Sequence, residues 1–261
     1  METAGLIRLG AFIGVLLLFT ALECVVPART RVLPRLARWR TNLSLSVLGT
    51  VVSALMAPVL AVSVAAAASA QGWGLFNVLS FDPWMEGALA VVLLDFAVWA
   101  QHVAFHHVPW LWRLHSVHHT DRDLDATTGV RFHPVEIGIS LLWKALVILA
   151  LGPSVLAVIA FEVVLNATSI FTHSNTALPR RLDRALRRLI VTPAMHRIHH
   201  SVRHTETDSN YGFNLSVWDR LFGTYRGQAA MPLTLGLSDH QTERPARLVA
   251  SLVLPFARRK P

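Results

Sequence analysis

Long apolar runs constrain the fold of this chain more than any other feature of its sequence. Hydrophobic residues make up 53% of the 261 residues, and only 15% are charged. This composition is too apolar for an ordinary soluble domain. We therefore expect an all-α fold, a polytopic helical membrane protein.

Three of the runs are long enough to cross a bilayer, which takes about 20 helical residues. They cover residues 6–26, 43–70 and 84–106. The first run resembles a signal anchor, because no small-residue cleavage site that would mark a removable leader follows it. Pro58 predicts a kink in the second run, and glycines and prolines mark residues 71–83 as a loop.

A further apolar tract, residues 137–171, is interrupted by Gly152 and Pro153. A Gly-Pro pair between two short arms predicts a helical hairpin that enters and leaves the membrane on one side. Lys144 and Glu162 lie at similar distances from this turn, so they are candidates to form an ion pair. In the alternative, the Lys144 ammonium extends along the helix to the membrane surface.

Arginines set the expected orientation of these segments. The loop after the first run contains an arginine cluster: Arg29, Arg31, Arg35, Arg38 and Arg40. By the positive-inside rule this loop is cytoplasmic and the N-terminus lies outside, so all the histidine clusters face the cytoplasm. Residues 179–190 combine arginine with leucine, which predicts an amphipathic helix on the inner leaflet. The net charge of +8 is concentrated in such segments and does not indicate nucleic-acid binding.

The histidines form a repeated pattern. The motif H-x-x-H-H occurs twice, and its histidines are His115, His118, His119, His196, His199 and His200. His102 and His106 precede the first copy at a spacing that puts both rings on one face of a helix. By the same spacing we expect the three imidazoles within each triplet to project toward a common point.

Eight histidines in three sets exceed the four or so ligands of one first-row metal ion, so we expect two neighbouring ions. The single cysteine, Cys24, rules out a cysteine-rich zinc site and an iron–sulfur cluster. Imidazole suits iron, zinc, copper and nickel, so the ligand type does not identify the metal. A lone histidine is ordinarily a hydrogen-bonded structural residue, but three sets on one membrane face favour a metal centre. We therefore expect the all-α membrane fold to carry a histidine-rich metal-binding cap that faces the cytoplasm.

Two polar stripes on the apolar helices share the spacing i, i+4, i+7 and i+11. Their members are Asp95, Trp99, His102 and His106 on one helix, and Glu162, Asn166, Ser169 and His173 on the other. Carboxylates inside a membrane are costly and usually face the protein interior. We therefore expect both stripes to point inward, and His173 becomes a ninth candidate ligand. Asp95 and Glu162 lie about 10 and 16 Å along their helices from the nearest candidate ligand, too far to bind the metal unless the helices bend.

Other residues are candidates to hydrogen-bond the ligands instead of binding metal. They are His133, His204, Asp95, Glu162 and Asn166. His133 fits a structural role at a helix start equally well, and His204 has direct ligation as its alternative. The acidic run Asp121, Asp123 and Asp125 is a candidate for the same hydrogen-bonding role, with a solvated loop as the alternative.

These motifs resemble those of the fatty acid hydroxylase and sterol desaturase superfamily of membrane histidine-rich di-iron enzymes. Further similar segments are R-F-H-P at 131–134, H-S-N at 173–175, N-Y-G at 210–212 and W-D-R-L-F-G-T-Y at 218–225. The resemblance covers residues 85–226. It implies that the metal ligands are His102, His106, His115, His118, His119, His173, His196, His199 and His200. Some members have a further histidine four residues before the position of His173, where this chain has Ser169.

The resemblance implies a membrane-bound di-iron oxygenase that uses O₂ and external electrons to hydroxylate or desaturate an unactivated C–H bond of a lipid, such as a fatty acyl chain or a sterol. It implies two iron ions and no catalytic residue beyond their ligands. Zinc in purified protein would be a replacement for iron, because Zn²⁺ ranks above Fe²⁺ in affinity. The sequence has no haem-binding segment or flavin fingerprint, so we expect a separate electron-donor protein. The arginine-rich residues 180–188 are a candidate dock for it, with phospholipid contact as the alternative.

The alternative function is a non-catalytic membrane metal-binding or metal-transport protein. The gathering of the histidines on one side of the membrane disfavours transport, and no repeat indicates alternating access. An intramembrane metalloprotease is a third interpretation, but the sequence lacks H-E-x-x-H.

We divide the chain into three predicted regions. Residues 1–83 form an N-terminal transmembrane region with two spans, residues 84–226 a fatty acid hydroxylase-like catalytic domain, and residues 227–261 a C-terminal tail. We expect an integral membrane protein of a bacterial cytoplasmic membrane, with its active site on the cytoplasmic face. No motif identifies the lipid, because a long apolar pocket is built from dispersed side chains.

Overall fold

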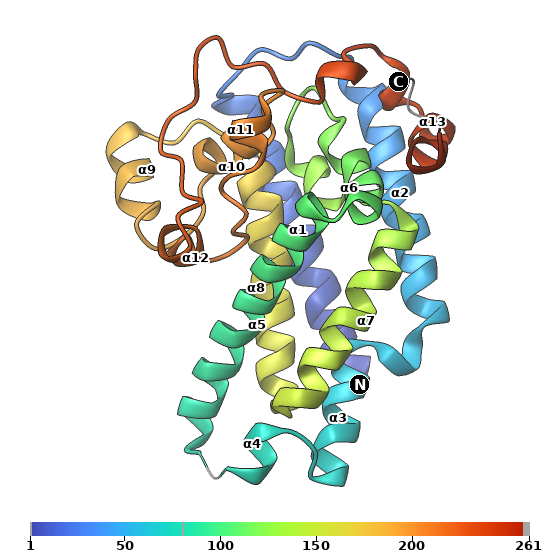
Figure 1. Ribbon diagram of the computed structural model, residues 1–261, viewed down its shortest axis with the longest axis vertical. Helices are drawn as coiled ribbons and strands as arrows, with labels where there is room; N and C mark the ends of the chain where they lie inside the picture. The colour runs from blue at the N-terminus through green and yellow to red at the C-terminus, as the bar shows by residue number, and fades with distance from the viewer. Residues whose placement is uncertain (1, 80, 258–261) are drawn as a thin grey trace.

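The computed structural model describes residues 2–79 and 81–257, and within these ranges it contains helices and connecting segments but no β-strand (Figure 1). The α-helices are α1 (Glu2–Val25), α2 (Arg35–Leu55), α3 (Ala61–Gln71), α4 (Leu75–Val78), α5 (Pro83–His107), α6 (Pro109–His119), α7 (Pro134–Leu151), α8 (Val155–His173), α9 (Arg180–Leu186), α10 (Pro193–His199), α11 (His204–Thr207), α12 (Val217–Leu221) and α13 (Leu248–Val253). The 3₁₀ helices are η1 (Ala57–Val59), η2 (Ala126–Val130), η3 (Ser238–His240), η4 (Arg244–Ala246) and η5 (Leu254–Phe256). The predicted all-α class is confirmed.

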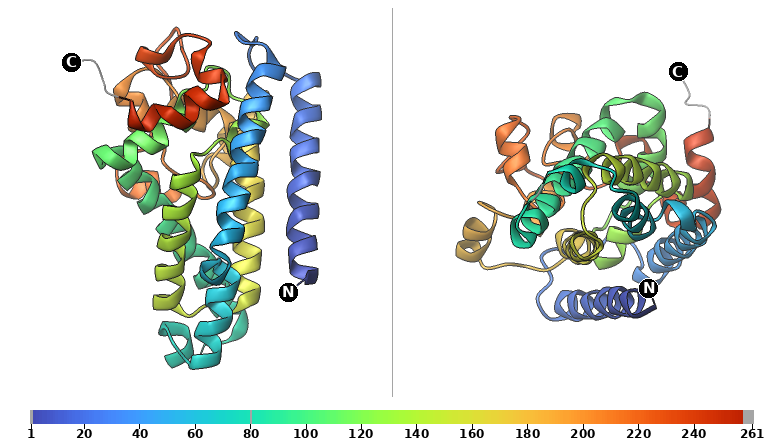
Figure 2. Two further views of the ribbon diagram at one scale, coloured as in Figure 1. Left: turned by 90° about the vertical axis from the view of Figure 1, so that its right-hand side faces the viewer. Right: turned by 90° about the horizontal axis from the view of Figure 1, so that it is seen from below.

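Four helices of the described chain are long and apolar enough to cross a membrane. The spans are Gly5–Val25 in α1 and the whole of α5, α7 and α8. Together with α2 and α3 they form an elongated helical bundle, in which α1 stands at the outer edge (Figure 2). At the centre of the bundle α5, α7 and α8 bury apolar side chains such as Leu94, Ile148 and Phe161. Close packing of these side chains holds the three helices together.

The second predicted span differs from expectation. Helix α2 already begins at Arg35 and ends at Leu55, and Pro58 lies in η1, which separates α2 from α3. Proline lacks an N–H group and its ring clashes with the preceding turn. The chain therefore breaks into two helices at Pro58 instead of bending within one, and both pieces pack along α7.

The predicted hairpin is confirmed: α7 and α8 are joined by a tight turn at Gly152, whose φ of 64° lies in the left-handed region. The loop before α5 packs directly on this turn. The Asn77 side chain donates a hydrogen bond to the Gly152 carbonyl at 3.1 Å, and a Cβ atom on Gly74 would collide with the Gly152 backbone. The two glycines thus allow the loop and the hairpin turn to touch.

The predicted ion pair inside the bundle is present and has a third member. Glu162 of α8 accepts a hydrogen bond from Lys144 of α7 at 3.1 Å and lies 2.8 Å from the guanidinium of Arg8 in α1. The carboxylate therefore connects three membrane helices, and it does not take part in the histidine sites. We call this group the Glu162 ion cluster.

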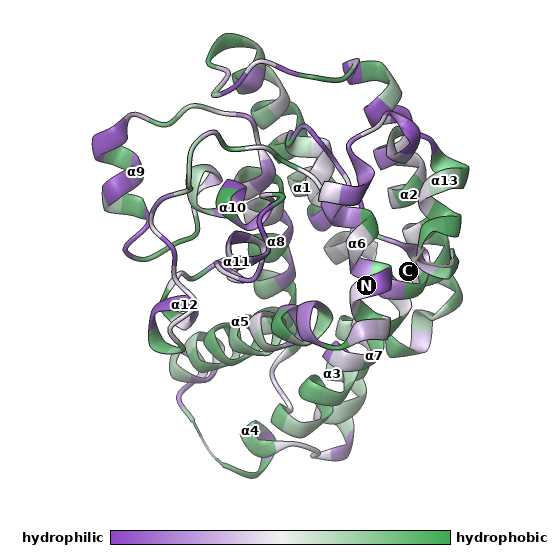
Figure 3. Ribbon diagram, turned by 45° about the horizontal axis from the view of Figure 1, so that its top comes forward, coloured by the Kyte–Doolittle hydropathy of each residue, from purple (hydrophilic) through white to green (hydrophobic). Residues whose placement is uncertain are grey.

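The segments outside the bundle form a cap at one of its ends (Figure 1). The C-terminal ends of α5 and α8 and the N-terminal end of α7 meet α6 and α10 there, whereas the hairpin turn and α4 lie at the opposite end. Hydrophilic residues are concentrated in the cap and hydrophobic residues in the bundle helices (Figure 3). The expectation that all the histidine clusters share one side of the membrane is consistent with this arrangement.

The acidic run of the cap is neither a solvated loop nor a partner of the histidines. Asp121 and Asp125 each lie 2.6 Å from the buried guanidinium of Arg38, and Asp123 accepts the backbone N–H groups of Val32 and Leu33. Burial alone would raise the pKa of Asp121, but the charge of Arg38 outweighs it and lowers this pKa to about 2. The run thus fastens the start of α2 to the cap.

The C-terminal segment also packs into the cap. Buried Arg131 donates hydrogen bonds to the Pro245 carbonyl at 2.8 Å, to Ser251 at 3.0 Å and to Asn42 of α2 at 2.7 Å. Arg131, in the loop before α7, thereby connects this loop to α2, to α13 and to the segment just before α13.

Candidate metal centre

All nine candidate ligands are buried in the cap and lie in two groups whose ring nitrogens are within 4.8 Å of one another. The five-histidine group consists of His102, His106, His115, His119 and His199. The four-histidine group consists of His118, His173, His196 and His200. Each group has enough imidazoles to hold a metal ion.

The H-x-x-H-H triplets do not converge as expected, because each of them divides between the two groups. His115 and His119 belong to the five-histidine group and His118 to the other; His196 and His200 belong to the four-histidine group and His199 to the other. Residues four apart on a helix project almost together, whereas the one between them points to the neighbouring group. Each motif therefore bridges both sites.

Local sequence signals start the two helices that carry the triplets. Pro109 and Pro193 occupy first-turn positions of α6 and α10, where a missing N–H costs nothing. The Thr192 side chain also caps α10, accepting a hydrogen bond from the Met195 N–H group. His196 therefore sits in the first full turn of α10.

Backbone carbonyls fix the orientation of four of the rings. The Nδ1 atoms of His102, His118, His173 and His199 lie 2.7, 3.2, 2.6 and 2.7 Å from the carbonyl oxygens of Tyr211, Arg131, Ser169 and Ser209, respectively. A carbonyl only accepts hydrogen bonds, so each Nδ1 carries the proton and each Nε2 presents its lone pair toward the centre.

Carboxylates orient two further rings, both in the five-histidine group. The Nδ1 atom of His115 donates to Glu136 at 2.6 Å, and that of His106 donates to Asp208 at 3.2 Å. Such a carboxylate fixes the tautomer and raises the basicity of the ligand. Glu136 and Asp208 were not expected from the sequence; the one signal for Glu136 is its position three residues after His133 in the R-F-H-P segment.

The inward Nε2 atoms approach one another closely. His102 and His115 are 3.0 Å apart at Nε2, His118 and His173 3.0 Å, and His173 and His196 2.9 Å. Two lone pairs at this distance repel each other unless a cation lies between them. Nitrogens bound to one metal at about 2.1 Å, at an angle near 90°, would be about 3 Å apart.

Protonation does not supply that cation. Burial lowers the pKa of His115 to about 3, and burial together with neighbouring histidines lowers the pKa of His118 and His196 well below the usual value. Among the residues that the structure describes, the Nε2 atoms of His106, His119 and His200 find no hydrogen-bond partner. Histidine binds metal in its neutral form, through the lone pair of a ring nitrogen. These buried imidazoles are neutral and direct their lone pairs inward, so they fit a metal centre.

The other candidates lie away from the two groups or touch them indirectly. His133 caps the start of α7, where it accepts the Val135 N–H group, and Asp95 accepts the indole N–H of Trp218 at 2.8 Å. His204 is exposed and lies 2.9 Å from Asp208, so it reaches the five-histidine group only through that carboxylate. Asn166 is exposed on α8, which contradicts the inward direction expected for the whole second stripe.

Asp219 connects two of the segments that carry the family resemblance. It accepts the backbone N–H groups of Tyr211 and Gly212 at 2.8 and 2.9 Å and the indole N–H of Trp99 at 3.1 Å. The N-Y-G segment is thereby held against α5, with the Tyr211 ring beside the five-histidine group and its carbonyl on His102. The sequence identifies the N-Y-G and W-D-R-L-F-G-T-Y segments as similar to the family, but it does not show that they orient the ligand His102.

A family model described as fatty acid hydroxylase matches residues 87–224, which is more than half of the chain. The chain belongs to the fatty acid hydroxylase family. The predicted resemblance is thus confirmed, in a family that uses iron. No solved structure matches the chain.

Several curated relatives are enzymes that act on lipids. The chain is 27% identical to the ornithine lipid hydroxylase of Rhizobium tropici over 182 residues, which are 68% of this chain and 53% of that protein. It is 28% identical to human alkylglycerol monooxygenase over 159 residues, 60% of this chain and 34% of that protein. It is 26% identical to rat cholesterol 25-hydroxylase over 140 residues, 53% of this chain and 46% of that protein. The chain thus spans about half or less of the length of these relatives.

Proposed function

We propose that this protein is a membrane-bound oxygenase that uses O₂ and external electrons to hydroxylate a C–H bond of a lipid. The observation that carries the proposal is the pair of histidine groups, buried and neutral, with inward lone pairs about 3 Å apart. The relatives support a lipid as substrate, because their names refer to an ornithine lipid, an alkylglycerol and cholesterol. Desaturation of the same kind of bond is the second outcome of this chemistry.

We further propose that each histidine group holds one iron ion, with the nine histidines as ligands and no other catalytic side chain. Two iron ions bound there would supply the O₂-dependent oxidation. The chain itself orients the imidazoles through carbonyls and carboxylates, keeps them neutral by burial, and excludes bulk water from the centre. Zinc found in purified protein would be a replacement for iron.

The finer topology belongs to the same proposal. We place the cap in the cytoplasm, because the arginine cluster that follows α1 lies on the cap side of the chain, and we place residues 84–226 as the catalytic domain. Since the centre would need electrons and the sequence carries no cofactor motif for them, a separate donor protein would deliver them from that side.

Metal analysis tests the centre directly. Full-length protein purified anaerobically is expected to hold about two iron ions per chain, and His199→Ala is expected to abolish turnover without changing membrane insertion. His107→Ala is the control, because His107 is exposed and lies next to the ligand His106 at the C-terminal end of α5. One metal ion or none in the unmodified chain, or normal turnover in His199→Ala, would contradict the proposal.

Comparison of lipid extracts tests the reaction. Cells that express the protein are expected to contain a lipid that gains one oxygen relative to cells that express His199→Ala; loss of two hydrogens would indicate desaturation. A change in cellular metal content with an unchanged lipid profile would instead favour metal transport.

A further inference from the structure

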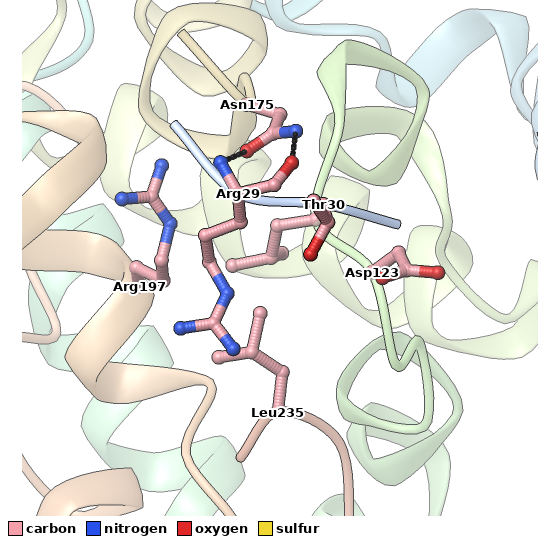
Figure 4. A pocket seen from close by; sticks show the side chains of 7 residues that line it. Arg29, Thr30, Asp123, Asn175, Arg197 and Leu235 are labelled. Atoms are coloured by element: carbon pink, nitrogen blue, oxygen red, sulfur yellow. Dashed lines mark hydrogen bonds between the residues drawn. The ribbon is translucent and has the colours of Figure 1, made fainter. Parts of the chain in front are cut away.

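A small cationic pocket lies in the cap, outside the two histidine groups (Figure 4). Its lining residues are Arg29, Thr30, Asp123, Leu124, Asn175, Arg197 and Leu235. They come from the segment that joins α1 to α2, from the acidic run, from the chain after α8, from α10 and from the C-terminal segment. The enclosed space of about 10 Å³ accommodates roughly one oxygen-sized atom.

Arg197 brings to this pocket a positive charge that no carboxylate contacts directly, although Asp183 and Glu23 lie close enough to act on it. Its side chain is only 9% exposed, its Nε atom has no partner, and its one hydrogen bond, to the Ser174 carbonyl, is long at 3.4 Å. Within residues 2–79 and 81–257 no carboxylate forms a salt bridge with it. A buried guanidinium without a counter-ion is costly, which indicates that an anion belongs beside it.

Arg29 supplies a second positive charge, and hydrogen bonds to Asn175 hold its backbone in place. Its N–H group donates to the Asn175 side chain at 3.1 Å, and the Asn175 amide donates back to the Arg29 carbonyl at 2.9 Å (Figure 4). The Arg29 guanidinium reaches the Leu233 carbonyl at 2.8 Å and leaves its other donors free of carboxylates.

Asp123 does not neutralise this pair, although it lines the pocket. Its carboxylate accepts the Val32 and Leu33 N–H groups at 2.9 and 2.7 Å, and it points away from both guanidinium groups (Figure 4). Guanidinium groups bind oxyanions such as phosphate through paired, charge-assisted hydrogen bonds.

The pocket lies at the level where the apolar spans end. The span of α1 ends at Val25, four residues before Arg29, and that of α8 ends at His173, two residues before Asn175. Phosphate groups of membrane lipids occupy this level. Among the lining residues Thr30 is exposed, so the pocket opens along the segment that joins α1 to α2.

We propose that Arg29 and Arg197 form a binding site for a phosphate group, carried by a membrane phospholipid or present as free phosphate. One phosphate oxygen enters the pocket between the two guanidinium groups, and the remainder of the ligand lies along the exposed Thr30 edge. The site is independent of the oxygenase proposal, because it uses none of the histidines.

Thermal unfolding of the full chain in phospholipid-free detergent, at constant ionic strength, tests the site. The protein is titrated in separate arms with inorganic phosphate, with phosphatidylglycerol and with monogalactosyldiacylglycerol, which has no phosphate. Saturable stabilisation by either phosphate compound, but not by the galactolipid, is expected. Stabilisation by inorganic phosphate identifies free phosphate as sufficient, and stabilisation by phosphatidylglycerol alone identifies a lipid headgroup.

Arg29→Gln and Arg197→Gln are each expected to weaken the binding about tenfold. Arg40→Gln is the matched control: it removes the same charge from an exposed position near the same interface, away from the pocket, and should bind like the unmodified chain. Because Arg29 is only half-buried and lies in a loop, Arg29→Gln decides the question even if Arg197→Gln does not fold. Equal binding by Arg29→Gln and the unmodified chain, equal stabilisation by the galactolipid, or no saturable effect would overturn the proposal.

Discussion

The five-histidine and four-histidine groups arise from the same repeated motif but have different surroundings. Two rings of the five-histidine group donate to carboxylates, Glu136 and Asp208. The oriented rings of the four-histidine group, His118 and His173, donate to backbone carbonyls and not to carboxylates. Asp208 is also partly exposed and meets the exposed His204, so one group has a polar connection to the surface that we do not see for the other.

The difference teaches that a repeated motif does not imply a repeated site. Each triplet contributes to both groups, so the environment of an ion depends on the chain around the motif. A carboxylate makes an imidazole a stronger ligand and compensates part of the metal charge, whereas a carbonyl mainly sets the tautomer. We therefore expect the five-histidine group to bind its ion more tightly.

The largest effects are expected from removing one ligand of each group. His119 and His200 form a matched pair, because both are fully buried and neither ring nitrogen of either residue has a hydrogen-bond partner within the described part of the chain. His119→Ala and His200→Ala should each lower turnover at least about 100-fold and each lose about one of two iron ions. Iron content and lipid product measured on the same preparations check this. Loss of both ions in either variant would show that the groups act as a single site.

A smaller effect is expected from the carboxylates. Glu136→Gln and Asp208→Asn keep the side-chain shape but replace the carboxyl group beside His115 and His106 with an amide. We expect each to weaken metal binding in the five-histidine group by about 10- to 100-fold and to leave the four-histidine ion in place. Titration with a competing chelator measures both affinities. Release of the four-histidine ion first would reverse the proposed ranking.

Acid should affect the metal-free chain through both groups alike. Burial lowers the pKa of His115 to about 3 and that of His118 well below its usual value, whereas an unfolded histidine titrates near 6.5. The unfolded state therefore binds more protons below about pH 6.5, and stability is expected to fall as pH decreases from there toward 3. Thermal unfolding of metal-free protein at pH 8 and pH 5 measures the effect; equal midpoints would show that these rings titrate normally.

The smallest effect is expected at the surface end of the polar connection. The His204 side chain is 90% exposed and contacts Asp208 at 2.9 Å. Exposed ion pairs contribute at most about 1 kcal/mol, so His204→Ala should change the metal affinity only about twofold. An effect as large as that of Asp208→Asn would mean that the histidine, and not the carboxylate alone, controls His106.

Local spacing was sufficient to predict the parts of the molecule that depend on helix periodicity. Three features can each be predicted from the residue spacing within a single helical segment. They are the shared face of His102 and His106, the turn at Gly152 and the burial of His173. The same periodicity failed for Asn166, because the face that a helix buries also depends on which neighbours cover it.

Contacts between distant segments could not be predicted in this way. The carboxylates that orient His106 and His115 lie 102 and 21 residues from them in the chain, and Arg38 lies 83 residues from Asp121. Nothing in the local pattern distinguishes a carboxylate that will be buried against such a partner from one that stays in water. The division of each triplet between two groups has the same origin, because it depends on how α6 and α10 face each other.

The Glu162 ion cluster has a consequence for how the chain enters the bilayer. A lone carboxylate within hydrocarbon costs several kcal/mol, and here its two cations come from α1 and α7, which both precede α8 in the sequence. The cost of inserting α8 is therefore offset only when both earlier helices are already beside it. Insertion of the first helix and of the hairpin is thus thermodynamically coupled, and an apolar anchor without an equivalent of Arg8 would not replace α1.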